Sequence, residues 1–390
     1  MPAPLRIAMV AGEASGDLLA SHLIRALQQH VPDAQFFGIG GPKMQAAGFR
    51  ADWPAEKLAV RGYAEVLRHY REIAGIRRQL LNRLLADPPD VFIGVDAPDF
   101  NLWLERRVKA AGIRSIHFVS PSVWAWRGGR IAKMARAVHQ VLCLFPFEPA
   151  LYAGTGVQAD YVGHPLADVI PLEIDLAAAR ERLGLMPDRM VFALLPGSRQ
   201  SELQYMARTF IETAKLLHQR FPQARFLVPL ASRETRTLFE TELWRSEAQE
   251  LPMTLLFGHA QEAMAAADGI LVASGTATLE AALMKKPLVI AYKMSPASWR
   301  IMRNMGYQPW VGLPNILAQR FAVPEFLQDE ATAENLAQAL GNAVCDNTLR
   351  ERLHALFTEI HLLLRQNTAE QAAAAILPAL GRHRRRDPRG

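Results

Sequence analysis

A chain of 390 residues is long for one hydrophobic core and of a comfortable length for two α/β domains. Half of its residues are hydrophobic, which excludes an intrinsically disordered protein. The formal net charge is +6, but the last nine residues (382–390) hold five arginines against one aspartate. The positive excess belongs mostly to this basic tail, so we expect no nucleic-acid partner.

Two cysteines, Cys143 and Cys345, lie among apolar or helical neighbours without the CxxC spacing of a metal or redox site. We expect two buried thiols, which suits a reducing cytoplasm. The apolar run at 7–11 is too short for a signal peptide, and no stretch approaches the roughly 20 apolar residues that span a bilayer. These features favour a soluble protein or one bound at a membrane surface.

The first half of the chain alternates apolar strands with helices. We expect strands at 6–11, 35–39, 91–95, 115–119, 138–144 and 159–162, a helix at 17–30 and one long helical stretch at 58–85. Such alternation is typical of βαβ units and predicts a doubly wound parallel sheet.

The loop after the first expected strand reads Gly12-Glu-Ala-Ser-Gly-Asp17. Its two glycines permit a tight turn, but the GxGxxG pattern of a dinucleotide site is missing. Ser15 or Asp17 can cap the following helix, which is the structural alternative. Neither the turn nor a cap requires Glu13, so Glu13 is a candidate for an active site.

The helical stretch at 58–85 has more apolar surface than one core-facing stripe needs, and arginines lie among its apolar residues. A helix of this kind can lie in a membrane interface. Val66, Leu67 and Tyr70 are therefore candidates for contact with an apolar acceptor or a membrane. A wide core-facing stripe is the alternative.

The strand at 91–95 ends in Asp96. In open α/β sheets, ligands bind beyond the carboxyl ends of the strands. A carboxylate at that place can accept a proton from a hydroxyl nucleophile, so Asp96 is the candidate general base. A purely structural hydrogen-bonding role is the alternative, and we assign Asp99 to the start of the next helix.

The strand at 115–119 is followed by Ser-Pro-Ser-Val-Trp-Ala-Trp-Arg at 120–127. Trp124, Trp126 and Arg127 are candidates for the wall of an acceptor pocket, with the arginine near an anionic group. An aromatic plug packed against the sheet is the alternative.

Glycine and proline interrupt the alternation at 163–168, and it then resumes with expected strands at 190–195, 226–229, 253–257, 269–272 and 287–291. This pattern predicts two doubly wound domains, 1–168 and 169–345. They are followed by C-terminal helices at 346–381 and the tail at 382–390.

Two glycine-bearing turns in the second half carry the most specific signal. Each joins an expected strand to an expected helix, so its backbone N–H groups and the positive end of the helix dipole form an anion site. Arg199 can neutralise a diphosphate, and Glu280 can accept hydrogen bonds from ribose hydroxyls, although an ordinary exposed glutamate behind a cap is the alternative. The residues assigned to the nucleotide are Gly197, Ser198, Arg199, Ser274, Gly275, Thr276 and Glu280.

The chain resembles the lipid-A-disaccharide synthase family from about residue 5 to 380, and this resemblance rests on six ordered motifs. They are GEASGD at 12–17, GVDAPDFN at 94–101, SPSVWAWR at 120–127, LPGSR at 195–199, SGTATLE at 274–280 and LPNILA at 313–318. The resemblance implies a GT-B fold, with two Rossmann-like doubly wound domains that face a central cleft. It also implies that C-terminal helices are exchanged in a homodimer.

The resemblance further implies a reaction. A 2,3-diacylglucosamine unit passes from UDP-2,3-diacylglucosamine to the 6-hydroxyl of 2,3-diacylglucosamine 1-phosphate (lipid X), with inversion. UDP and a β-1,6-linked disaccharide 1-phosphate result, at the cytoplasmic face of the inner membrane. The pattern contains no HExxH, CxxC or clustered histidines, and we expect neither a metal nor another cofactor.

By motif, Asp96 is implied as the general base, with Glu13 and Ser15 at the active site. Asn315 is implied, together with Arg199 and Glu280, to surround the UDP-sugar. Many GT-B enzymes place a histidine in the first glycine loop, and this loop has none, which gives Asp96 more weight. Two alternatives stay open: another GT-B UDP-sugar transferase or epimerase, and a non-catalytic binder of a nucleotide sugar or lipid.

Overall fold

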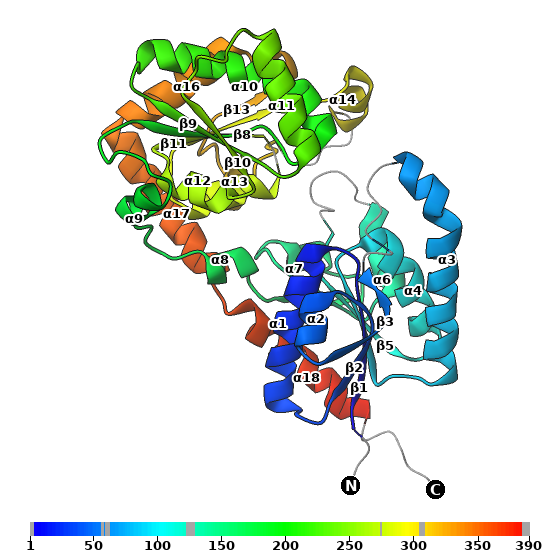
Figure 1. Ribbon diagram of the computed structural model, residues 1–390. Helices are drawn as coiled ribbons and strands as arrows, with labels where there is room; N and C mark the ends of the chain where they lie inside the picture. The colour runs from blue at the N-terminus through cyan, green and yellow to red at the C-terminus, as the bar shows by residue number, and fades with distance from the viewer. Residues whose placement is uncertain are drawn as a thin grey trace, which may run out of the picture. The chain divides into compact units, whose positions relative to one another are not determined.

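The computed structural model describes residues 4–55, 58, 63–121, 129–273, 275–303 and 309–383; of these, the side chains at 63–70, 301–303 and 381–383 are not described. The chain forms two compact units, Met1–Asp168 with Leu363–Gly390, and Val169–Leu362. Each unit is built on one parallel sheet with helices on both faces (Figure 1). The expected α/β class with two doubly wound sheets is confirmed.

The first unit contains a seven-stranded sheet in the order β3-β2-β1-β4-β5-β6-β7. Its strands are β1 (Arg6–Ala11), β2 (Gln35–Gly40), β3 (Phe49–Pro54), β4 (Val91–Val95), β5 (Arg114–Phe118), β6 (Gln140–Cys143) and β7 (Gln158–Tyr161). The sequence did not predict β3, because Arg50 and Asp52 interrupt the apolar pattern of this edge strand. The strand order reverses between β1 and β4, which makes this pair the switch point of the sheet.

The helices of the first unit cover both faces of the sheet. They are α1 (Ala14–His30), α2 (Pro42–Ala46), α3 (Tyr63–Ala86), α4 (Pro98–Ala110), α6 (Gly129–Ala137), α7 (Glu148–Leu151), α8 (Pro165–Val169) and α18 (Thr368–His383). Figure 1 shows α1 and α2 on one side and α3, α4 and α6 on the other.

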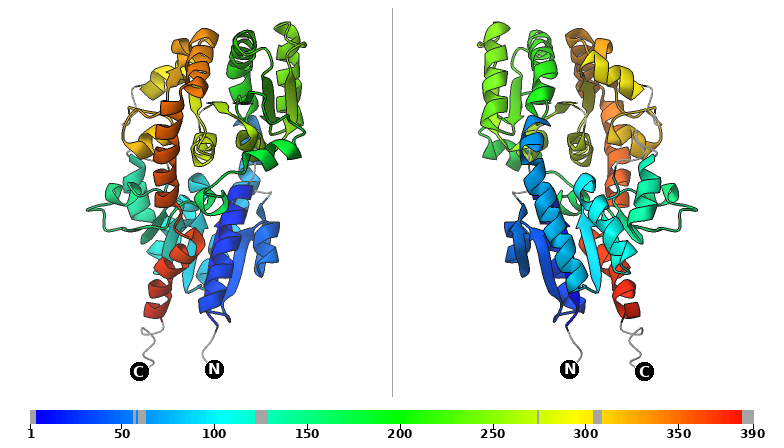
Figure 2. Two further views of the ribbon diagram at one scale, coloured as in Figure 1. Left: turned by 90° about the vertical axis from the view of Figure 1, so that its left-hand side faces the viewer. Right: turned by 90° about the vertical axis from the view of Figure 1, so that its right-hand side faces the viewer.

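The last helix, α18, returns to the first unit and lies beside α1 (Figure 2). The side chain of Gln140 donates to the carbonyl of Ala375 at 2.9 Å, which ties α18 to β6. The carboxylate of Asp168 accepts from the N–H groups of Asn367 and Thr368 at 2.9 and 2.8 Å. The bonds from Asp168 connect the start of α18 to the end of the segment Met1–Asp168 of the same unit.

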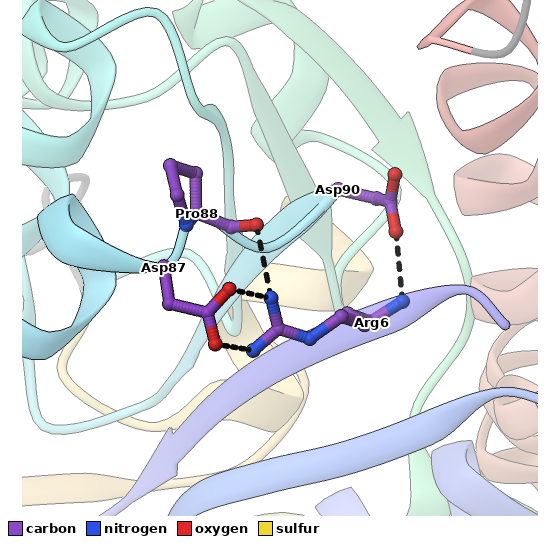
Figure 3. A network of polar contacts seen from close by, with 4 residues as sticks. All are labelled: Arg6, Asp87, Pro88 and Asp90. Carbon is purple, nitrogen blue, oxygen red and sulfur yellow. Dashed lines mark hydrogen bonds and ion pairs between the residues drawn. The ribbon is translucent and has the colours of Figure 1, made fainter. Parts of the chain in front are cut away.

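At the amino end of the first sheet, Arg6 joins β1 to the segment that precedes β4 (Figure 3). Its backbone N–H donates to Asp90 Oδ2 at 2.8 Å, and its Nη2 donates to Asp87 Oδ2 at 2.6 Å. The guanidinium also contacts the second oxygen of Asp87 and the carbonyl of Pro88. This network therefore pairs the two central strands at the end opposite to the switch-point loops.

The loop after β1 differs from the expectation at Asp17. We expected Ser15 or Asp17 to cap α1, but the N-cap residue of α1 makes no side-chain cap, and Asp17 is buried in the first turn of the helix. Its carboxylate binds the start of α2 instead, through the N–H groups of Gly41 (2.9 Å), Lys43 (3.0 Å) and Met44 (3.0 Å). One carboxylate thus links the loops after β1 and β2.

The second unit contains a six-stranded sheet in the order β10-β9-β8-β11-β12-β13. Its strands are β8 (Val191–Leu195), β9 (Arg225–Leu230), β10 (Met253–Phe257), β11 (Gly269–Ala273), β12 (Leu288–Tyr292) and β13 (Glu325–Leu327). The short edge strand β13 was not predicted. The order reverses between β8 and β11, so the switch point of this sheet lies between the two strands that lead into the glycine turns.

Helices also cover both faces of the second sheet. They are α9 (Leu176–Arg182), α10 (Gln200–Arg220), α11 (Arg233–Arg245), α12 (Ala260–Ala266), α13 (Thr276–Leu283), α14 (Pro296–Arg303), α15 (Leu313–Ala318), η2 (Gln328–Glu330), α16 (Ala333–Cys345) and α17 (Asn347–Leu364). Figure 1 shows α10, α11 and α16 on one face and α9, α12 and α13 on the other. The apolar core between the sheet and α10 and α16 includes the fully buried Phe192, Phe210 and Leu340.

The two cysteines have different surroundings. Cys143 on β6 is buried, as expected. Cys345 is exposed, so the expectation of a buried thiol is wrong for this residue. Cys345 is the last residue of α16 and is not among the residues of this helix that are buried against the sheet.

We expect Asp17→Ala to lower the free energy of unfolding of the first unit by about 3 kcal/mol, because three backbone donors at the start of α2 lose a charged acceptor. Asp17→Asn, which keeps one acceptor oxygen, should cost less. Denaturant unfolding measures both. The exposed Asp33, changed to Ala, is the matched control, and an equal effect of Asp17→Ala and Asp33→Ala would contradict this role.

Candidate functional site

The two glycine turns of the second unit lie on one pocket of about 410 Å³. It forms at the carboxyl ends of β8, β9 and β11, where loops on either side of the switch point diverge. Six of the residues assigned to the nucleotide line it: Gly197, Ser198, Arg199, Gly275, Thr276 and Glu280. Ser274 lies outside the described residues. A pocket of this size suits a small-molecule ligand.

The first turn is capped from within the chain. Oε2 of Glu202 accepts the backbone N–H groups of Ser198 at 2.9 Å and Arg199 at 3.2 Å. We expected these donors to point outward to an anion, but a carboxylate of the helix they begin already binds them. No role was expected for Glu202, although a glutamate at the third position of a helix is a recognisable capping signal.

The second turn leaves its donors to a ligand. Gly275 has a φ of 115°, a backbone conformation that residues with a side chain rarely adopt. It is the N-cap residue of α13 and provides no side-chain cap. The N–H of Thr278 donates to the carbonyl of Gly275 at 3.1 Å. The helix cannot itself satisfy the N–H groups of Thr276 and Ala277, and both residues line the pocket. The start of α13 therefore offers the backbone donors for an anion.

Two charged side chains complete this pocket. The side chain of Arg199 is 80% exposed and lies 4.0 Å from Glu202 Oε1, so its guanidinium is available to a ligand. Glu280 lies behind the start of α13, where it accepts a hydrogen bond from Gln261 at 3.2 Å. Burial raises the pKa of the Glu280 carboxyl, and the bond from Gln261 opposes part of that rise. No sequence signal pointed to Gln261, which comes from α12.

Asn315 does not line this pocket. Its side chain is fully buried (0% exposed), and Nδ2 donates to Val323 O at 2.9 Å and Glu325 Oε1 at 2.7 Å. Its Oδ1 accepts the N–H groups of Ala322 and Val323 at 2.7 and 2.9 Å. With four bonds made inside the unit, the side chain holds the segment before β13 in place. Direct contact with a UDP-sugar stays a prediction that this geometry does not support.

In the first unit, Asp96 lies directly after β4, at the switch point. Asp96 and Ala97 have φ values of 52° and 43°, so two successive non-glycine residues are left-handed. Each such residue costs about 1–2 kcal/mol, and strain of this kind is concentrated at functional sites. The residue is half-buried, and no hydrogen bond or ion pair to its carboxylate is found within the described part of the chain. The Asp96 carboxylate is thus available for chemistry.

Glu13, on the loop after β1, and Ser15, in the first turn of α1, are both exposed, and β1 is the other strand of this switch point. The loop packs against the turn of Asp96, since a Cβ placed on Gly12 would lie 3.4 Å from the Cβ of Ala97. The three candidates of the first unit therefore occupy adjacent segments at one edge of the sheet.

The candidates for the acceptor and membrane surface are only partly described. Trp124, Trp126 and Arg127 lie outside the described residues, and Val66, Leu67 and Tyr70 belong to α3 without described side chains. Further along α3, the side chains of 76, 80 and 84 are buried in the core of the first unit. This part of the helix carries a core-facing stripe.

A second hollow, about 640 Å³, lies at the amino ends of β11 and β12. It is lined among others by Asp268, Lys286 and Arg350, and burial lowers the pKa of Lys286 to about 8. None of the sequence-predicted site residues with a described side chain lines it. Doubly wound sheets bind ligands at the carboxyl ends of their strands, so we place the candidate site in the pocket of the glycine turns.

In the ranges that the structure describes, no three His, Cys, Asp or Glu side chains gather as a metal site would require. No helix within those ranges is long and apolar enough to cross a bilayer.

Known proteins similar to this chain agree with the fold. A family model described as "Lipid-A-disaccharide synthetase" matches residues 7–377. A lipid-A-disaccharide synthase of Azoarcus sp. (strain BH72) is 63% identical over 375 residues, 96% of each chain.

Two solved structures are similar in fold at low sequence identity. The UDP-GlcNAc 2-epimerase from Neisseria meningitidis has a TM-score of 0.64 at 12% identity, over 97% of this chain and 100% of that one. A structure described as the glycotransferase of kitacinnamycin has a TM-score of 0.61 at 17% identity, over 97% and 100%. These likenesses show a GT-B fold of two Rossmann-like domains.

The family model matches almost the whole chain. The Azoarcus relative is 63% identical to it over nearly the full length, which is high enough to assign a family. The chain therefore belongs to the lipid-A-disaccharide synthase family of UDP-sugar glycosyltransferases.

Proposed function

We propose that this chain transfers 2,3-diacylglucosamine from its UDP derivative to the 6-hydroxyl of 2,3-diacylglucosamine 1-phosphate, with inversion at the anomeric carbon. UDP binds in the pocket of the glycine turns, and Asp96 is the general base. One observation carries the proposal: residues from both turns, whose glycines Gly197 and Gly275 are 78 positions apart, line a single pocket at a switch point.

The donor pocket contains the groups that a leaving diphosphate needs. The N–H groups of Thr276 and Ala277 and the positive end of α13 bind the phosphate oxygens. The exposed guanidinium of Arg199 adds a full positive charge where negative charge develops as the sugar bond breaks. Glu280 accepts hydrogen bonds from the ribose hydroxyls. These groups belong to the chain itself, so the step is written without a metal.

The acceptor is a neutral alcohol and needs a base. The Asp96 carboxylate takes the proton of the 6-hydroxyl as its oxygen attacks the anomeric carbon, and UDP leaves from the opposite face. Glu13 on the adjacent loop and Ser15 in the first turn of α1 bind or orient the acceptor sugar. A carboxylate without a structural partner suits this role, because no existing bond must break first.

Both substrates carry acyl chains, so we also propose that the enzyme works as a peripheral protein at the cytoplasmic face of the inner membrane. Contact with the acyl chains is assigned to Val66, Leu67 and Tyr70 on α3 and to Trp124, Trp126 and Arg127. Assembly as a homodimer is part of the same proposal.

The reaction itself is tested by measuring UDP release with donor and acceptor present and with each omitted in turn. We expect release to depend on both substrates. A binder would release no UDP, and an epimerase would act on the donor without the acceptor.

Asp96→Asn should lower kcat by about 100- to 10,000-fold while UDP affinity by calorimetry stays unchanged, because the variant keeps the shape of the turn and loses the base. Asp99→Asn is the matched control, since Asp99 is 95% exposed and pairs only loosely with Arg130 at 3.5 Å. Near-normal turnover of Asp96→Asn, or an equal loss in Asp99→Asn, would remove Asp96 as the base.

Arg199→Ala should weaken UDP binding by about 10- to 100-fold, the value of a hydrogen bond between charged groups. Arg208→Ala removes an exposed arginine of the same helix that does not line the pocket, and it should leave UDP affinity unchanged. Calorimetric titration with UDP measures both variants. Unchanged affinity in Arg199→Ala would contradict its role at the diphosphate.

Glu280→Gln should weaken UDP binding and yet not lower stability. The pKa of Glu280 is raised above 4.5 by burial, so folding disfavours the ionised form and wild-type protein loses stability as pH rises past that value. The neutral variant avoids this loss at neutral pH, and the difference should vanish below pH 4.5. Thermal unfolding at both pH values measures it; a variant that is less stable at neutral pH would show that Glu280 is a structural group.

A further inference from the structure

A cluster of buried polar side chains lies directly beneath the turn that carries Asp96. Its members are Asn101 and Glu105 on α4 and His117 on β5, and each is 0% exposed. Their neighbours on the same elements, such as Leu104, belong to the apolar core of the first unit. Polar groups in such surroundings are costly unless they are used, so the cluster needs an explanation.

Asn101 contacts the turn itself. Its Nδ2 donates to the backbone carbonyl of Asp96 at 2.7 Å, and its backbone N–H donates to the carbonyl of Ala97 at 3.0 Å. The N–H of Asp96 donates to the carbonyl of Phe118 on β5 at 2.9 Å. These bonds hold both left-handed residues, from α4 and from β5. The bond to the Asp96 carbonyl comes from the Asn101 side chain.

The rest of the cluster determines where the Asn101 amide lies. Asn101 and Glu105 are one helical turn apart and both face Gly94 on β4: a Cβ on Gly94 would lie 2.1 Å from Glu105 Oε1 and 3.0 Å from Asn101 Cγ. Glu105 Oε1 lies 2.7 Å from His117 Nδ1, and His117 is the register partner of Gly94. The Glu105–His117 pair therefore joins α4 to β5 just below Asn101, in the space that a glycine leaves.

Folding stability alone does not account for these residues. Asn101 Oδ1, Glu105 Oε2 and His117 Nε2 have no hydrogen-bond partner among the described residues. Apolar side chains of similar volume would avoid that cost, since buried polar groups are often less stable than well-packed apolar ones. What the cluster supplies instead is a fixed backbone carbonyl at a strained turn.

We infer that Asn101 is a positioning residue for the transfer reaction. Its bond to the Asp96 carbonyl holds the left-handed turn and so sets the direction of the Asp96 carboxylate, and the Glu105–His117 pair keeps α4 at the height where this bond forms. The inference rests on the proposed role of Asp96 as the base.

Asn101→Leu keeps the side-chain volume and removes the donor. We expect kcat to fall by about 10- to 100-fold, because the carboxylate is no longer held in the reactive direction. KM for the UDP-sugar should not change, since the donor pocket belongs to the other unit, and the thermal midpoint should be equal or higher. Ser115→Ala, which removes a buried hydroxyl without a described partner on β5, is the control and should keep full kcat.

The decisive measurement repeats Asn101→Leu in an Asp96→Asn background. If Asn101 acts through Asp96, the substitution costs nothing further on the residual kcat of Asp96→Asn. An equal fold-loss in both backgrounds would show a general structural role and overturn the inference, as would unchanged kcat of Asn101→Leu in wild-type protein. If Asn101→Leu fails to fold, Asn101→Ala, which also removes the donor and adds no bulk, replaces it in the same cycle.

The outcomes separate this inference from the proposed function. If Asp96→Asn itself turns over normally, the base assignment fails and the inference fails with it. If Asp96→Asn is inactive while Asn101→Leu and Asn101→Ala keep full kcat, the base assignment stands and only the positioning role is overturned.

Discussion

Every strand in both units runs parallel to its neighbours, and this constraint decides where chemistry is possible. A central parallel strand has its hydrogen bonds filled on both sides and its two faces covered by helices. Polar side chains therefore find room only beyond the strand ends, above all where the strand order reverses. The switch points lie between β1 and β4 and between β8 and β11. The candidates Glu13, Asp96, Arg199 and Glu280 all follow these four strands.

The two helix starts of the donor pocket look alike in sequence and differ in structure. Glu202 occupies the backbone donors of the first turn, so that turn contributes the side chain of Arg199. Among the described residues the second turn has no such cap, and the N–H groups at the start of α13 are open to an anion. In the proposed function, a negative ligand would meet the exposed guanidinium of Arg199 on one side and the start of α13 on the other, and each would supply a different part of its stabilisation.

The acidic and amide residues discussed above fall into two groups, those whose oxygens bind the fold and those proposed for chemistry. Asp17 and Asn315 use their oxygens within the fold, at the start of α2 and around β13. Asp96 has a strained backbone and a carboxylate with no described partner, and Glu280 is an acid whose pKa is raised by burial. Both features lower the free energy of unfolding, so the residues proposed for chemistry destabilise the fold.

The sequence by itself determined the α/β class, almost all strands, the two glycine turns and the family, because apolar runs, glycine turns and motifs are local patterns. Tertiary structure alone decided that edge strands β3 and β13 pair, that Asp17 binds α2 and that α18 joins the first unit. It also brought Glu105 on α4 to His117 on β5. These facts depend on which distant segments meet, and the energy of such contacts is set by geometry that no local pattern encodes.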